Sequence, residues 1–240
     1  MLDLHCHILP GLDDGAADPG VSLEMAAMAA DSGITHIFAT PHCNTRNERK
    51  NFYGPELIKA FTDLQSLLDQ EGIPLKILSG AEILARGHFT EHLAAGDFMT
   101  LNGSRYLLVE FYFNEDPDFM DRCLRAVEAE GLVPVVAHPE RYYCVQRSPE
   151  LAQIWADQGR VIQLNKGSLL GDLGPEVYDT AAMLLRRGAA SVIASDAHHF
   201  QYRTPHMGAL LDCLASRFPE ADPELLLWGN PLKIAKDQAL

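Results

Sequence analysis

The amino-acid sequence predicts an α/β fold, a distorted and TIM-like (β/α)7 barrel built from a single domain, residues 1–240. Short apolar segments alternate with amphipathic segments along the chain, and glycines follow several amphipathic segments as they follow helices. A strand that is followed each time by a helix pairs in parallel with the next strand. Seven such repeats favour a closed barrel over an open sheet, and 240 residues suffice for one barrel.

The expected strands and helices alternate in chain order. We expect strands at 2–7, 35–40, 75–78, 106–111, 133–137, 161–164 and 190–194, because these segments are short and apolar. We expect helices at 20–32, 55–71, 89–95, 117–130, 149–158, 175–187 and 205–217, followed by a helical tail.

The composition narrows the classes of partner. The formal net charge of −14 is the opposite of what a nucleic-acid backbone or an anionic membrane attracts. A phosphate-containing substrate remains possible if positive charge is concentrated in one site. The five cysteines are scattered, no signal-peptide pattern precedes the first strand, and no apolar run reaches the length of a membrane span. We therefore expect a cytoplasmic protein without membrane insertion.

Two histidines at the end of the first expected strand suggest a metal site. Successive side chains of a strand point to opposite faces, so His5 and His7 share one face and Cys6 lies on the other. Two imidazoles at this spacing can hold one ion, and they stand where an α/β barrel keeps its active site. The alternative is a pair of partly exposed histidines at a frayed N-terminus.

More potential ligands follow the other strands. A barrel gathers the carboxyl ends of its strands on one face, where the sequence places Asp14, His42, Glu82, Glu110, His138, Asp196 and His198. Taken singly, Glu82 could be a surface acid, Asp14 a turn residue and His138 a core histidine. Together, four carboxylates in one pocket repel one another unless cations hold them ionised. Mixed imidazole and carboxylate ligation favours manganese, iron or zinc, and nine ligands imply two or three ions.

Two arginines are candidates for phosphate binding. Arg141 shares a loop with His138, and Arg203 follows the last ligand loop. A guanidinium group can hold two phosphate oxygens at once. His206 is a weaker candidate, and for each arginine the alternative is a surface ion pair.

The motifs that carry these residues resemble the PHP superfamily of metal-dependent phosphoesterases, and within it the bacterial CpsB/CapC-type protein-tyrosine phosphatases. The resemblance runs nearly from end to end, through 3–7 (DLHCH), 13–15 (DDG), 41–42 (PH), 80–82 (GAE), 104–111 (SRYLLVEF), 137–142 (AHPERY), 163–169 (QLNKGSL), 195–198 (SDAH) and 230–231 (NP). It implies a distorted (β/α)7 barrel with three metal ions, manganese foremost.

The resemblance also implies roles for single residues. The first ion would take His5, His7, Glu82 and Asp196, the second Glu82, Glu110 and His138, and the third Asp14, His42 and His198. Arg141 and Arg203 would bind the phosphate. The implied substrate is phosphotyrosine on a protein, foremost the tail of a bacterial tyrosine kinase of capsule or exopolysaccharide synthesis. Segment 44–53 varies in such proteins and would shape access to the site.

The expected chemistry follows from the ions. Water bound to a divalent ion ionises near pH 7 rather than near 15.7, so a hydroxide bridging two ions about 3.5–4 Å apart could attack phosphorus in line. Arg141 and the remaining ion would neutralise the phosphoryl oxygens. The sequence assigns no general acid for the leaving group.

Three other interpretations remain open. Residues 42–49 fit HCx5R, the signature of cysteine-dependent tyrosine phosphatases, in which Cys43 would be the nucleophile. This segment has no glycine, carries Glu48 and is followed by Lys50 where Ser or Thr is usual. The same metals could instead serve a histidinol-phosphate phosphatase or a general phosphoesterase. The third interpretation is a non-catalytic metal-binding module, although the sequence lacks none of the ligands.

Overall fold

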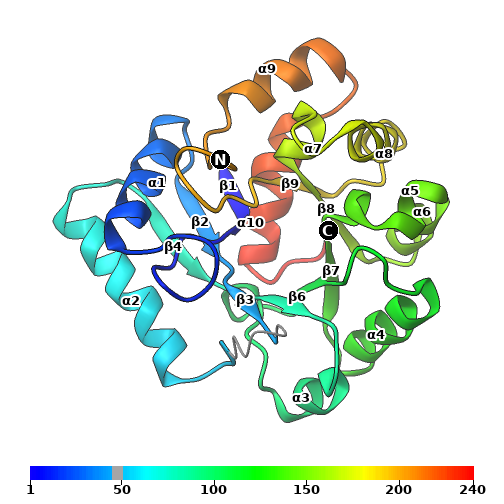
Figure 1. Cartoon of the computed structure of the whole chain (residues 1–240), viewed down its shortest axis with the longest axis horizontal. Helices are drawn as coiled ribbons and strands as arrows, with labels where there is room; N and C mark the ends of the chain where they lie inside the picture. Colours follow the sequence, from blue (N-terminus) through cyan, green and yellow to red (C-terminus); the bar gives the residue numbers. More distant parts are fainter. Residues whose placement is uncertain (45–50) are drawn as a thin grey trace.

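The computed structural model describes residues 1–44 and 51–240 as parallel strands surrounded by helices (Figure 1). The sheet orders are β1-β2-β4 and β3-β5-β6-β7-β8-β9, and every pair is parallel. The strands are β1 (Leu2–Cys6), β2 (His36–Ala39), β3 (His42–Cys43), β4 (Lys76–Ser79), β5 (Glu82–Leu84), β6 (Tyr106–Glu110), β7 (Val133–Ala137), β8 (Val161–Asn165) and β9 (Val192–Ala194). Each of the expected strands is present within two residues of its predicted bounds.

The second and third expected strands are each followed, after a break, by a short strand that the sequence did not predict. β3 continues β2 beyond Pro41, and β5 continues β4 beyond Gly80. Proline offers no N–H to a strand ladder. Gly80 has no room for a side chain, because a Cβ there would lie 2.9 Å from Leu101 Cδ2 and 3.1 Å from Thr40 Cγ2. Since β2 pairs with β4 and β3 pairs with β5, both strands pass from one sheet to the other at these breaks.

The two sheets meet again where β1 faces β9. Cys6 bridges Ala197 in parallel, and the His7 N–H donates to the Ala197 carbonyl at 2.8 Å. The buried Asp3 carboxylate accepts a hydrogen bond from the Ser195 N–H, also at 2.8 Å. These bonds and the two broken strands close the sheets into the distorted barrel that the sequence predicts.

Helices cover the outside of the strands (Figure 1). The expected helices are α1 (Pro19–Asp31), α2 (Pro55–Gln70), α3 (Phe89–Ala95), α4 (Pro117–Ala129), α6 (Glu150–Asp157), α8 (Pro175–Arg186) and α9 (Gly208–Arg217), the last of which begins later than predicted. The chain adds α5 (Tyr143–Arg147), α7 (Lys166–Leu170), short turns at Leu101–Gly103 and Pro139–Arg141, and a tail made of a π-helical turn (Leu225–Gly229) and α10 (Asn230–Ala235). Within 1–44 and 51–240, no helix has the length and apolar character needed to cross a membrane.

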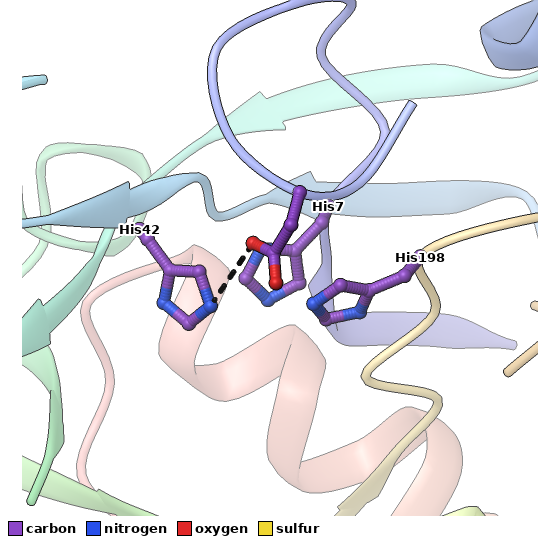
Figure 2. Close-up of side chains that lie close together, drawn as sticks. His7, His42 and His198 are labelled. Carbon is purple, nitrogen blue, oxygen red and sulfur yellow. Dashed lines mark ion pairs between the residues drawn. The ribbon is translucent and has the colours of Figure 1, made fainter. Parts of the chain in front are cut away.

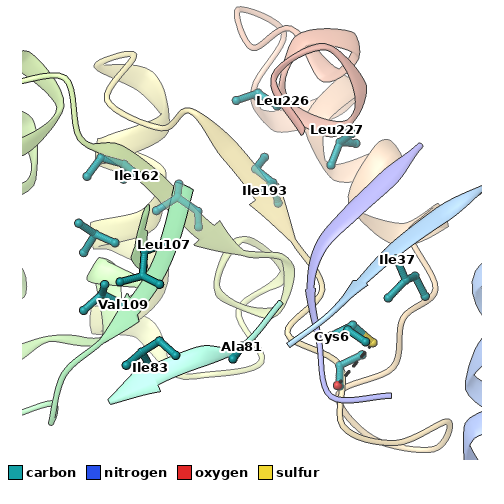
Figure 3. Close-up of a cluster of buried hydrophobic side chains, with 14 of the residues drawn as sticks. Cys6, Ile37, Ala81, Ile83, Leu107, Val109, Ile162, Ile193, Leu226 and Leu227 are labelled. Atoms are coloured by element: carbon teal, nitrogen blue, oxygen red, sulfur yellow. Dashed lines mark hydrogen bonds between the residues drawn. The ribbon is translucent and has the colours of Figure 1, made fainter. Parts of the chain in front are cut away.

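The hydrophobic core has two layers. The larger layer lies between strands and helices and includes Cys6, Ile37, Ile83, Leu107, Ile162 and Ile193 (Figure 3). The second layer fills the barrel with alternate strand residues, among them Leu2, Leu4, Phe38, Tyr106, Leu108, Val135, Ala137, Val161, Val192 and Ala194. Ile234 of α10 packs on this inner layer, and the Asn230 side chain donates to the Ser191 carbonyl just before β9. The tail therefore covers the barrel end at which the strands begin.

Candidate metal centre

All the predicted site residues lie at the other end of the barrel, where the strands finish. They come from the ends of β1 and β6, from the short strands β3 and β5, and from the loops that follow β1, β7 and β9. Nitrogen-to-oxygen distances of 3.6 Å or less connect all eleven into one cluster: His5, His7, Asp14, His42, Glu82, Glu110, His138, Arg141, Asp196, His198 and Arg203.

Four of these side chains form a buried inner group: His5, His7, Glu82 and Asp196, each at most 2% exposed. His5 Nε2 lies 3.1 Å from His7 Nε2 and 3.3 Å from Glu82 Oε2. Asp196 Oδ1 lies 3.6 Å from His5 Nε2 and 3.5 Å from His7 Nε2. Ligands about 2.1 Å from one tetrahedral ion are about 3.4 Å apart. The inner group therefore has both the size and the donor set of a transition-metal site.

His5 of β1 and His7 just after it point their Nε2 atoms toward each other. His5 Nδ1 lies 3.0 Å from Gln163 Oε1, and His7 Nδ1 lies 2.6 Å from Asp13 Oδ2. Because both partners are acceptors, Nδ1 is the donor in each ring, and a neutral ring then has its lone pair on Nε2. Two such lone pairs 3.1 Å apart repel each other unless a cation lies between them. Two neutral rings in this arrangement present both Nε2 lone pairs to one position, as two ligands of a single ion do.

An outer group, which we define as Asp14, His42, Glu110 and His198, borders the inner group on the solvent side. His42 is 19% exposed and Asp14 is 59% exposed. His42 Nδ1 lies 2.9 Å from Glu82 Oε2 and 3.0 Å from Glu110 Oε1, and its Nε2 lies 3.5 Å from Asp14 Oδ1. Burial alone would lower the pKa of His42, but the neighbouring carboxylates raise it to about 10. This raised pKa shows how strongly the position attracts positive charge.

His198 completes the outer group. The rings of His7, His42 and His198 lie close together in Figure 2, and the ring centroids of His7 and His198 are 3.9 Å apart. His198 Nδ1 donates to the Asp196 carbonyl at 3.0 Å, while Nε2 is buried without a hydrogen-bond partner. Burial is the largest cause that lowers the pKa of His198, to about 2, so its ring is neutral. Its Nε2 is therefore another lone pair available to an ion.

Glu82 stands between the groups as a bridging ligand would. Its Oε2 faces the inner group and His42, whereas its Oε1 lies 2.8 Å from His138 Nε2. Burial alone would raise the pKa of Glu82, but the surrounding histidines hold it well below its usual value. The close groups of ligand atoms differ from the sets implied by the family resemblance. His42 rather than His138 lies with Glu82 and Glu110, and His7 lies with Asp14, His42 and His198 as well as with His5 and Asp196.

Both predicted arginines reach the same buried carboxylate. Arg203 Nη2 lies 2.6 Å and Arg141 Nη1 lies 3.5 Å from Asp196 Oδ2. The Arg141 guanidinium also lies over the Phe113 ring, 4.3 Å from its centroid. A partner that is 2% exposed makes both pairs part of the site rather than surface ion pairs. A cavity of about 740 Å³ opens beside Arg203, with Asp196 and His206 also in its lining.

Three of the site residues hold a strained backbone. His138, Asp196 and Arg203 have φ values of 35°, 49° and 46°, in the left-handed region that residues other than glycine seldom adopt. Such conformations cost about 1–3 kcal/mol each and cluster at functional sites. The strain turns these side chains toward the cluster from loops that follow β7 and β9.

Asp13 is a site residue that the sequence analysis left without a role. Its Oδ2 accepts from His7 Nδ1 at 2.6 Å and from the His42 N–H at 2.9 Å, and its Oδ1 accepts from the Gly15 N–H at 2.9 Å. A side chain at Gly15 is excluded, because a Cβ would lie 2.1 Å from the His7 carbonyl oxygen. The DDG motif was visible in the sequence, but its spacing did not show that its first aspartate holds a histidine. Gln163 and Asn165 were missed in the same way.

Cys43 does not have the environment of a catalytic thiol. It is fully buried, and burial raises the pKa of its thiol to about 12. A nucleophilic cysteine needs a lowered pKa near neutral pH. Arg49 of the HCx5R signature lies outside the described residues, as does most of the variable segment 44–53.

The family model for capsular polysaccharide synthesis, CpsB/CapC, matches residues 1–236. The chain belongs to the CpsB/CapC family. Within this family it is 35% identical over 230 residues to the tyrosine-protein phosphatase YwqE of Bacillus subtilis (strain 168), across 94% of this chain and 88% of the relative. It is 28% identical over 247 residues to the tyrosine-protein phosphatase CpsB of Streptococcus pneumoniae, across the full length of both chains.

A solved structure agrees with this membership. A crystal structure from work on YwqE of Bacillus subtilis and CpsB of Streptococcus pneumoniae, described as unique metal-dependent tyrosine phosphatases, matches with a TM-score of 0.91 and 34% identity. The match covers 100% of this chain and 96% of the other. The CpsB/CapC resemblance and the barrel predicted from the sequence are therefore confirmed.

Proposed function

We propose that this CpsB/CapC-family chain is a metal-dependent protein-tyrosine phosphatase of capsule or exopolysaccharide synthesis. The inner group is the observation that carries the proposal, because its four buried ligand atoms surround a position of the right size for one ion. Relatives that match along nearly the whole chain are named tyrosine-protein phosphatases. The domain that would carry this activity is the single unit 1–240.

The proposed cofactor is a set of two or three divalent ions, manganese foremost and iron or zinc as alternatives. His5, His7, Glu82 and Asp196 would hold the first ion, Glu82, Glu110 and His138 the second, and Asp14, His42 and His198 the third. When bound, such ions supply a water molecule that ionises near neutral pH and charge that stabilises the phosphoryl group. The buried Nε2 of His198, which has no hydrogen-bond partner, fits this set.

The chain's own residues would position the phosphate. Asp196 anchors one nitrogen each of Arg141 and Arg203, which leaves their other N–H groups available for phosphoryl oxygens. Phe113 supports the guanidinium of Arg141 from below. A tyrosine leaving group has a pKa near 10, so it needs less help from a general acid than an alkyl alcohol does. The cavity of about 740 Å³ beside Arg203 offers room for residues next to the phosphotyrosine.

The proposed substrate is phosphotyrosine on a protein partner in the cytoplasm, foremost the tail of a bacterial tyrosine kinase. The net charge of −14 accords with a protein partner rather than a nucleic acid. The alternative with the same metals is a histidinol-phosphate phosphatase or a general phosphoesterase.

The decisive experiment compares substrates and metal states of the full chain. With Mn²⁺ added, we expect turnover of a phosphotyrosine peptide with a kcat/KM well above that for histidinol phosphate, and complete loss of turnover in EDTA. Faster hydrolysis of histidinol phosphate would favour the alternative. Full activity in EDTA, or no turnover of either ester after reconstitution with Mn²⁺, would overturn the proposal.

A further inference from the structure

Two uncharged polar side chains lie inside the barrel beside the inner group. Alternate residues of β8 face inward, and they change from the apolar Val161 to Gln163 and Asn165 as the strand approaches the site. Gln163 is fully buried and Asn165 is 2% exposed. Burying an amide costs free energy unless its polar atoms are hydrogen-bonded. The hydrogen-bond partners of the two amides therefore indicate their role.

The two amides connect two of the proposed ligands of one ion. His5 Nδ1 lies 3.0 Å from Gln163 Oε1, and Gln163 Nε2 lies 2.8 Å from Asn165 Oδ1. Asn165 Nδ2 lies 2.6 Å from Asp196 Oδ2. The result is an unbroken series of hydrogen bonds from His5 to Asp196 that runs along β8.

The Asp196 carboxylate sets the donor and acceptor of every hydrogen bond in this series. The Asp196 carboxylate can only accept, so Asn165 must turn its NH₂ group toward it and its oxygen toward Gln163. Gln163 must then donate to Asn165 and turn its own oxygen toward His5. His5 must in turn donate from Nδ1, which leaves its lone pair on Nε2, the atom that faces the ion position.

We propose that Gln163 and Asn165 form a directional relay that fixes His5 and Asp196 as a matched pair of ligands and so sets the affinity of the ion held by the inner group. The inference rests on the proposed metal site and deepens it. Asp196 keeps Oδ1 toward the ion because its Oδ2 is held by Asn165 and Arg203. Both amides are positioning residues, since neither places an atom among the proposed ligands.

A second contact holds the relay in place. The Asn165 N–H donates to Glu140 Oε1 at 2.9 Å, and the Ser168 hydroxyl donates to the same oxygen at 2.6 Å. Glu140 is fully buried and lies two residues after His138. The end of β8 is thereby tied to the loop after β7, so that Asn165 has little freedom to turn away from Asp196.

The test measures metal binding directly, with Mn²⁺ alone as the probe and no substrate. The variants Gln163→Met and Asn165→Leu keep approximate side-chain volume and remove the polar ends. Leu164→Val is the matched control, because Leu164 is buried on the same strand but packs in the larger core layer, between strands and helices. For each full-length variant, the Kd and the number of Mn²⁺ ions are measured by chelator competition, and the thermal midpoint of the metal-free protein is recorded.

In each relay variant the Kd of one Mn²⁺ ion per chain should rise about 10- to 100-fold, as it usually does when a metal ligand loses its hydrogen-bond partner. The other ions and the control should keep their affinities. The double variant should bind that ion little worse than either single variant, because each single change already interrupts the same series of hydrogen bonds. Rescue by excess Mn²⁺ should restore full occupancy.

Unchanged Mn²⁺ affinity in a folded Gln163→Met or Asn165→Leu protein would overturn the relay, even if the thermal midpoint fell. Independent and additive losses in the double variant would also overturn it. If one variant fails to fold, the other tests the relay from its opposite end. These outcomes do not depend on the phosphatase activity: a chain that binds Mn²⁺ in this way but hydrolyses no phosphotyrosine would contradict the proposed function and leave the relay intact.

Discussion

The inner and outer groups of the candidate metal centre differ in how the fold holds them. The inner group takes its side chains from strand ends and from a strained loop, is at most 2% exposed, and has ligand separations of 3.1 to 3.6 Å. The outer group includes Asp14, which lies on a loop and is 59% exposed. Buried ligands that are fixed before the ion arrives lose little freedom on binding it. We therefore expect the ion of the inner group to be held tightly and the ion proposed for Asp14, His42 and His198 to exchange.

Within the inner group, the two histidines differ in the charge of the side chain that orients them. His7 is oriented by the Asp13 carboxylate on the loop after β1, whereas His5 is oriented by the uncharged Gln163 on β8. A carboxylate makes an imidazole a stronger metal ligand than an amide does. The two neighbouring histidines are thus held by partners of different charge, and variants on each side can separate the contributions.

The largest effect is expected from His5→Ala. The change removes a ligand of the inner ion and the end of the amide relay. Activity on a phosphotyrosine peptide should fall by more than about 100-fold, and excess Mn²⁺ should not restore it, because loss of a ligand costs more than loss of its hydrogen-bond partner. Circular dichroism should show an intact barrel, since His5 lies at a strand end. Substantial activity in a folded His5→Ala protein would contradict the inner site.

Asp13→Asn should have the next largest effect. Asp13 accepts hydrogen bonds from His7 and His42 at one oxygen and from Gly15 at the other. An asparagine side chain has one accepting oxygen and therefore cannot replace both. We expect Mn²⁺ affinity to fall about 10- to 100-fold, measured by chelator competition. Asp18→Asn is the matched control, because its side chain caps α1 away from the site and asparagine caps equally well. Equal losses in both variants would argue against a role for Asp13 in orienting His7.

Asp14→Ala should cost less and be recoverable. Its carboxylate is exposed and touches the centre through His42. At low Mn²⁺ the activity should fall, and at saturating Mn²⁺ it should return to within about 10-fold of the original, because an exposed ligand can be replaced by water. The measurement is activity as a function of Mn²⁺ concentration. A loss as large and as resistant to Mn²⁺ as that of His5→Ala would remove the distinction between the two groups.

The smallest effect is expected from Cys43→Ser. Cys43 follows His42 of the outer group, but its thiol is buried and its pKa is about 12. Activity at saturating Mn²⁺ should stay within about threefold, because a thiol that is not ionised at neutral pH takes no part as a nucleophile. Abolished activity in a folded Cys43→Ser protein, together with resistance of the original chain to EDTA, would support the cysteine-dependent alternative.

The fold was predictable because its signals are local. Alternation of apolar and amphipathic segments placed the seven expected strands within two residues of their observed bounds, but it did not predict the short strands β3 and β5. The break after β4 was not predictable, since Gly80 packs there against Leu101, which is distant in sequence, and Thr40, which lies between β2 and β3. The candidate ligands were visible because strand-end positions in a parallel barrel meet on one face whatever the loops do.

What the sequence by itself determined is the barrel, the family and the set of residues at the strand ends, because each depends on periodicity or on short ordered motifs. The tertiary structure alone decided which atoms meet. It separated an inner group from an outer one, placed both arginines on Asp196, and joined His5 to Asp196 through Gln163 and Asn165. Those partners lie up to 158 positions apart in the chain, so no local pattern records them, and they become neighbours only when the barrel closes.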